Sequence, residues 1–180
     1  MDLSEKIERA FSARAKPAQV RLGDEVVQLD SDLEEALWFS GRDWHKLTWQ
    51  NWQEHSCAIF FFDPEAFAYY LPSVLLLAVE NPKESLNAAD SLINQLDRSP
   101  DTEGWTEGFT NRFLGLNPAE LNVLKEWLLH VCEYAPYKRW GTAASGPGDT
   151  FGRAYDTVDL LQKEIERRRL TITPPTASGV

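Results

Sequence analysis

Two carboxylates and two tyrosines lie close together between residues 63 and 70 of this chain. Asp63 and Glu65 are residue types that act as general acids and bases, and Tyr69 and Tyr70 can donate or accept a proton beside them. The same order, Asp63-Pro64-Glu65, is also what the start of a helix requires. Asp accepts from free backbone N–H groups, Pro fits the first turn, and Glu faces the positive end of the helix dipole. We therefore interpret the carboxylates as capping residues and keep both tyrosines as site candidates, because a buried tyrosine hydroxyl needs a polar partner.

Histidine and cysteine, the other residue types that bind metals or act as nucleophiles, do not have the spacing of a metal site. His45 and His55 form no His-x-x-x-His or Glu-x-x-His pattern, and His130 and Cys132 point to different sides of a helix. The sequence thus predicts no metal site and no cofactor. Cys57 and Cys132 are too few for a disulfide framework, and we expect both to be buried, reduced thiols. A nucleophilic Cys57 beside a histidine stays open, because such partners meet only in three dimensions.

Tryptophan is the third notable residue type, with four of the seven tryptophans between residues 38 and 52. Such a cluster can form an aromatic ligand cage or an interface hot spot, although core packing is the more common use of aromatic side chains. The partner- or ligand-binding candidates from the sequence are Tyr69, Tyr70, Trp44, Asp63 and Glu65.

The charge of the chain limits the classes of partner. Of 180 residues, 28 are acidic and 18 are Lys or Arg, which gives a net charge of −10. Residues 138–180 hold seven Lys or Arg and five Asp or Glu, a net charge of +2, which leaves −12 for residues 1–137. This balance disfavours nucleic acid and anionic membranes as partners and allows a basic protein partner. With no apolar signal segment at the N-terminus and no apolar run long enough to span a bilayer, we expect a cytoplasmic protein.

Hydrophobic periodicity predicts a mainly α fold, an irregular bundle of five to six helices. Pro72 lies within one of these helices and should kink it or split it in two. Alternating apolar residues near 19–29 suggest one small β-hairpin. We expect one globular domain over residues 1–172 and a frayed tail over 173–180. The main predicted helices are residues 2–15, Asp63 to Val79, 84–97, Asn117 to Ala135 and 153–169, with shorter ones from Asp30 to Trp38 and after Thr48.

One pattern resembles a known protein family. It runs Phe62-x-Pro64-Glu65-Ala66-Phe67-x-Tyr69-Tyr70-Leu71-Pro72, with Ala10-Phe11 and Trp44 before it and Leu116-x-Pro118-x-Glu120 after it. These residues resemble a family of small, mainly bacterial, single-domain proteins whose function is unknown, over roughly residues 3–135. The resemblance implies no catalytic residue. By analogy with other small acidic bacterial proteins, the resemblance suggests an immunity or antitoxin-like binding role.

Two functional hypotheses follow from the sequence. The first is a protein-binding module for a basic partner, supported by the acidic charge and the many aromatic residues. The second is an enzyme that uses carboxylate, tyrosine or histidine groups in a groove near Pro72. The sequence leaves open the identity of any partner or substrate, the oligomeric state, and whether the Trp and Tyr cluster is buried or exposed.

Overall fold

The computed structural model of the protein describes residues 1–20, 30–137 and 149–172. Within them, nine α-helices and two 3₁₀-helices form a mainly α structure, with no β-strand in these ranges. The α-helices are α1 (Leu3–Phe11), α2 (Asp30–Trp38), α3 (Trp49–Glu54), α4 (Ala58–Phe61), α5 (Pro64–Glu80), α6 (Asn87–Leu96), α7 (Glu107–Leu114), α8 (Pro118–Val131) and α9 (Thr150–Ile172). The 3₁₀-helices are η1 (Trp44–Lys46) and η2 (Thr102–Gly104).

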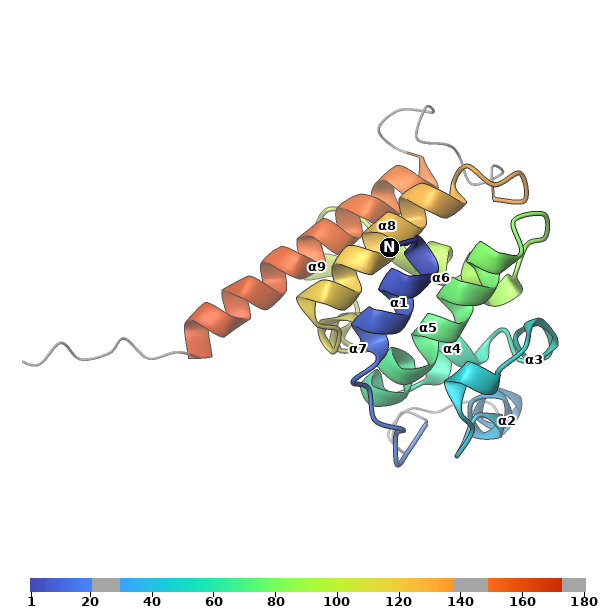
Figure 1. The fold of residues 1–180 in the computed structure, drawn as a ribbon. Coiled ribbons are helices and arrows are strands. Elements are labelled where there is room, and N and C mark those ends of the chain that lie inside the picture. The colour runs from blue at the N-terminus through green and yellow to red at the C-terminus, as the bar shows by residue number, and fades with distance from the viewer. Residues whose placement is uncertain (21–29, 138–148, 173–180) are drawn as a thin grey trace, which may run out of the picture.

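Helix α5 is the centre of the bundle. Helices α9, α8, α1 and α5 lie side by side in that order (Figure 1), and each contacts the next. Helices α6 and α7 each contact both α5 and α9, while η1 packs on α5 and α4 joins α2 to α6. Side chains of α5 are buried without interruption from Ala66 to Leu75. A helix that is apolar on all sides needs neighbours on all sides, and these contacts supply them.

The start of α5 confirms the capping interpretation. The Asp63 carboxylate accepts the Ala66 N–H at 2.7 Å, Pro64 occupies the first turn, and Glu65 is the acidic residue of that turn. The helix continues through Pro72 to Glu80 without a break. The predicted alternative of two separate helices is therefore wrong, because tertiary contacts on every side hold the helix together across the proline.

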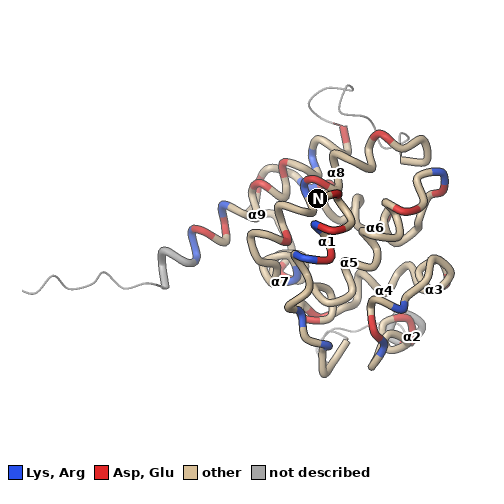
Figure 2. Tube along the Cα trace, in the orientation of Figure 1, with Lys and Arg blue, Asp and Glu red and all other residues tan. Residues whose placement is uncertain are grey.

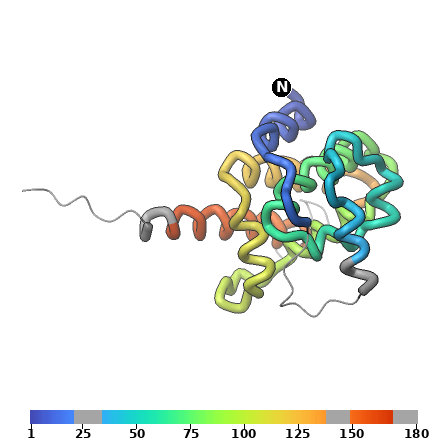
Figure 3. The backbone as a smooth tube through the Cα atoms, turned by 90° about the horizontal axis from the view of Figure 1, so that it is seen from below, coloured from blue at the N-terminus to red at the C-terminus, as the bar shows by residue number. Residues whose placement is uncertain are grey.

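Helices α8 and α9 complete the core. Asn117 caps α8 by accepting the N–H groups of Ala119 and Glu120 at 2.8 and 3.0 Å, and Glu120 closes a capping box. Helix α9 contacts α6, α7 and α8 and then projects beyond the bundle (Figures 1 and 3). Its fully or nearly fully buried apolar side chains are Phe151, Ala154, Val158 and Leu161.

The predicted mainly α bundle is confirmed, but the number of helices differs from the prediction. The described residues hold more helices than five or six, because α4 and α7 lie where no helix was expected. Helix α4 has only four residues, too few to show a hydrophobic period. The 19–29 hairpin falls on residues 21–29, which lie outside the described residues, as does the 173–180 tail. The single domain over residues 1–172 stays a prediction. No helix among the described residues is long and apolar enough to cross a membrane.

Candidate functional site

Tyr70 is a structural residue. Its side chain is fully buried, and its hydroxyl donates to the carbonyl oxygens of Phe39 at 2.5 Å and Arg42 at 3.2 Å. Burial, more than any neighbouring charge, raises the pKa of Tyr70 to about 12. Its ring packs against Phe39 and Phe62 at centroid distances of 5.3 and 5.2 Å. The hydroxyl thus holds the turn after α2 against α5 and is not a free acid or base.

Tyr69 and Trp44 are also mostly buried, with 5% and 3% of their surfaces exposed. The ring of Tyr69 meets that of Tyr70 edge to face at 4.9 Å. Burial first, and the Asp43 carboxylate second, raise the pKa of the Tyr69 phenol. The Trp44 indole stacks on the His45 ring at 3.6 Å. The structure therefore buries Trp44, Tyr69 and Tyr70, and they do not form an exposed aromatic cage.

Asp63 and Glu65 lie at the other end of this segment, at the start of α5. Burial of the Asp63 carboxyl raises its pKa, although the Ala66 N–H works against this shift. Glu65 is exposed. Neither carboxylate lines any of the three cavities described below, nor does Tyr69 or Tyr70. Asp63, Glu65, Tyr69 and Tyr70 thus do not meet at any of these three cavities.

The tryptophan cluster divides between core and surface. Trp52 is fully buried, and its indole N–H donates to the Ser73 hydroxyl at 3.0 Å. Ser73 in turn donates to the Tyr70 carbonyl at 2.7 Å. Trp38 is half-buried, with the Arg42 guanidinium 3.6 Å from its ring centre and the His55 ring stacked at 4.4 Å. Both interactions leave the Trp38 ring without an open face for a ligand.

The histidines and cysteines occupy separate places. The His45 ring bonds the Asp43 carboxylate at 2.9 Å, and the His130 ring bonds the Tyr134 hydroxyl at 2.6 Å. The described residues hold no group of three or more His, Cys, Asp or Glu side chains that could bind a metal ion. Cys132 is buried as expected, whereas Cys57 is exposed, so that part of the prediction is wrong. Cys57 precedes α4 at the surface because the short helix turns its apolar residues inward from Ala58 onward.

One buried cation ties three helices together. Arg112 of α7 donates to the Gln95 side-chain oxygen at 2.7 Å and to the Ile59 carbonyl at 3.3 Å. Burial, with help from the nearby Arg98 charge, lowers the pKa of Arg112 to about 10. Arg112 Nε and Gln95 Nε2 have no hydrogen-bond partner in the described part of the chain. Such a site trades stability for a defined position of α7 against α4 and α6.

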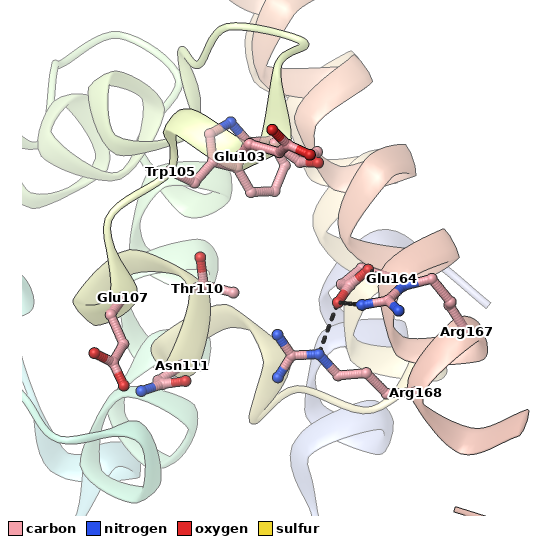
Figure 4. A pocket seen from close by; sticks show the side chains of 9 residues that line it. Glu103, Trp105, Glu107, Thr110, Asn111, Glu164, Arg167 and Arg168 are labelled. Atoms are coloured by element: carbon pink, nitrogen blue, oxygen red, sulfur yellow. Dashed lines mark hydrogen bonds and ion pairs between the residues drawn. The ribbon is translucent and has the colours of Figure 1, made fainter. Parts of the chain in front are cut away.

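A cavity of about 680 Å³ lies between α9 and the η2–α7 segment (Figure 4). Trp105 and Glu103 stand on one side, and Glu164 of α9 stands across from them. Hydrogen bonds from Arg167 and Arg168 hold the pKa of Glu164 at about 2. The charged groups on the α9 side therefore satisfy each other, and this cavity has the character of a solvated cleft between two elements.

A smaller groove lies where α1, η1 and α5 meet, and one of the predicted site residues, Trp44, lines it. Its cavity of about 140 Å³ is lined by Trp44, His45 and Ser73, the residue after Pro72. Its apolar floor includes the half-buried Leu76 and Leu77 of α5. The remaining lining residues are Glu8, Leu47 and Glu80.

Two carboxylates flank this groove, Glu8 on α1 and Glu80 at the end of α5. Both are exposed, and neither has a hydrogen-bond or ion-pair partner among the described residues. Acidic and basic segments are interspersed along α9 and also on α1, the helix that carries Glu8 (Figure 2). Sequence reasoning missed Glu8 and Glu80 because they are remote in sequence and each is an ordinary polar residue of its helix. Only the packing of α1 on α5 brings them to one groove.

Comparison with known proteins assigns the chain to a family. The model of a family of unknown function (DUF6714) matches residues 1–140. The chain belongs to this family. The matched range includes α1 to α8, and therefore the α5 motif and the α1–α5 groove, whereas α9 lies beyond it. The predicted membership of a family of unknown function is thereby confirmed. No curated protein and no solved structure matches the chain significantly.

Proposed function

We propose that this member of DUF6714 is a non-catalytic binding module for a basic protein partner, which docks in the groove between α1 and α5. The observation that carries the proposal is the pair of unpaired carboxylates, Glu8 and Glu80, beside the apolar floor at Leu76 and Leu77. A basic amphipathic segment matches this surface, because its apolar side chains can cover the leucines while Lys or Arg pairs with the carboxylates.

The charge of the chain supports the same partner class. Residues 1–137 carry a net charge of −12, which attracts a cationic partner over a distance before contact. Neutralising a basic protein by capping its cationic surface is what an immunity or antitoxin-like role requires. This finer role is part of the proposal.

The roles of the other predicted residues support binding over catalysis. Asp63 is used as a helix cap, and Tyr70 gives its hydroxyl to two backbone carbonyls. A catalytic group instead needs a free position at a cavity, close to a reacting atom. The groove itself presents carboxylates and leucines, which suit recognition.

The test is direct binding of a defined basic probe. A fluorescein-labelled helical peptide built of Lys and Leu at amphipathic spacing is titrated with the full chain, and anisotropy gives the Kd. The double variant Glu8→Gln/Glu80→Gln should raise this Kd about tenfold, because two exposed ion pairs contribute about 0.5–1 kcal/mol each. Raising salt from about 50 to about 500 mM should weaken the wild type more than the double variant.

The matched control removes the same charge far from the groove. Asp156 and Glu166 are exposed on α9 and have no ion-pair partner among the described residues, so Asp156→Asn/Glu166→Gln is the equivalent pair. We expect this control to change the Kd less than about twofold, through net charge alone. If both double variants weaken peptide binding equally, the peptide is attracted only by the overall acidic charge, and the groove is not its binding site.

A further inference from the structure

A second cavity, of about 390 Å³, has the opposite electrostatic character. It lies between the chain that follows α1 and the turn between α2 and η1. Lys16 comes from the first segment, Arg42 comes from the turn, and Lys46 is the last residue of η1. Basic segments lie on both of these stretches (Figure 2). Three cations around one cavity stand out in a chain whose net charge is −10.

The guanidinium of Arg42 is held in place before any ligand arrives. Its Nε donates to the Trp38 carbonyl at 2.7 Å, and its charged group lies 3.6 Å from the Trp38 ring centre. Gly41, with φ of 71°, makes the left-handed turn that lets Arg42 fold back over Trp38. The terminal nitrogens of Arg42 have no hydrogen-bond partner among the described residues, so they remain available to an acceptor. A fixed guanidinium loses less side-chain entropy on binding than a free one.

The other charges at the cavity leave a positive excess. Lys16 Nζ donates to the Gly41 carbonyl at 2.9 Å, which uses one of its three hydrogens and holds the ammonium beside Arg42. Lys46 has no ion-pair partner in the described ranges. Asp43 is the acidic lining residue, and its carboxylate is engaged by the His45 ring and backbone N–H. Three cations and one carboxylate leave a charge of +2 around the cavity.

We propose that this cavity, formed by Lys16, Arg42 and Lys46, binds the phosphate group of a small phosphorylated metabolite. Phosphate carries the charge and the acceptor oxygens that two ammonium groups and one oriented guanidinium satisfy together. The volume of about 390 Å³ falls in the range of small-molecule sites, which favours a free metabolite over a long polymer. Since both faces of Trp38 are covered, recognition rests on the phosphate rather than on stacking of a base.

This site adjoins the proposed groove, since Leu47 lines both cavities. Their charged side chains differ, because Lys16, Arg42 and Lys46 line this cavity whereas Glu8 and Glu80 line the groove. The two surfaces also select opposite charges. Failure of one proposal therefore leaves the other untouched.

The experiment is calorimetric titration of the full chain with pyrophosphate and ADP, followed by inorganic phosphate. We expect one-site binding, tighter for pyrophosphate and ADP than for phosphate. The variant Lys16→Gln/Lys46→Gln should weaken binding at least about tenfold, since it removes two charge-assisted contacts. Arg42→Lys keeps the charge but loses the planar guanidinium group that stacks on Trp38, so it should weaken binding severalfold.

The matched control is Lys83→Gln/Lys163→Gln, two exposed lysines outside the cavity. It should change affinity less than about twofold, and circular dichroism should show the same fold for every variant. A phosphoserine peptide serves as the macromolecular arm. No binding of any free phosphate probe up to about 10 mM would overturn the proposal. So would equal weakening by the control, or binding of the phosphoserine peptide alone.

Discussion

The ion pair between Arg14 and Glu120 makes a sharp test of how the N-terminal segment is attached to α8. Arg14 Nε donates to one carboxylate oxygen at 2.6 Å, and its Nη2 donates to the other oxygen and to the Gly115 carbonyl at 2.8 Å. The Glu120 side chain is only 1% exposed, against 26% for Arg14. Glu120 also accepts the Asn117 N–H at 2.7 Å, as part of the capping box.

The substitution Arg14→Met removes the cation and leaves a buried carboxylate. Breaking a buried pair from one side costs about 3–5 kcal/mol. Here the exposed edge of Arg14 admits water, and Glu120 keeps its backbone hydrogen bond. We therefore expect a loss of about 2–3 kcal/mol in the free energy of unfolding. For a chain of this size, this corresponds to a fall in Tm of about 5–10 °C.

Urea unfolding followed by tryptophan fluorescence measures this loss, because Trp52 and Trp127 are fully buried and report on the core. The control is Arg9→Met, an exposed arginine in the last turn of α1, for which we expect less than about 0.5 kcal/mol. Adding Glu120→Gln to the wild type and to Arg14→Met completes a double-mutant cycle for this pair, with an expected coupling energy of about 1–2 kcal/mol. If Arg14→Met costs no more than Arg9→Met, the reasoning about the buried pair is refuted.

Two further predictions follow from the pKa shifts. Tyr70→Phe should lower the free energy of unfolding by about 1 kcal/mol, because the hydroxyl loses its backbone acceptors. In a titration followed at 295 nm, this variant should lack the tyrosine that ionises near pH 12. Loss of a tyrosine that ionises near pH 10 would contradict the burial argument. Hydrogen bonds from Arg153 lower the pKa of Asp97 below its ordinary value of 3.8. The ion pair therefore stabilises the folded state above pH 3.8, and this stabilisation is lost as the pH falls through the lower pKa of the folded state. Wild type should therefore exceed Asp97→Asn by about 1 kcal/mol in urea unfolding at pH 7 and by little near pH 2, and a gap independent of pH would argue against the ion pair.

The local signals in the sequence predicted local structure well. Asp63-Pro64 and Asn117-Pro118 start helices because a cap depends on neighbours within three residues. The central position of α5 follows from its composition, since a helix that is apolar on nearly all sides demands burial.

The candidate site was less predictable. Tyr70 is a buried brace, which its sequence neighbours did not reveal, because its partners Phe39 and Arg42 are some thirty residues away. Glu8 and Glu80, or Lys16 and Arg42, meet only when separate segments pack together. No spacing rule describes such a surface, so it could be found only from the folded chain.

The position of α9 has a consequence for the family as a whole. The family model ends at residue 140, but the core does not, because α9 covers apolar surface of α6 and α8 with Phe151, Ala154, Val158 and Leu161. A member reduced to the matched range would expose that surface to water, at a cost that scales with its apolar area. A chain reduced to residues 1–140 should therefore need another segment or a partner chain to cover α6 and α8.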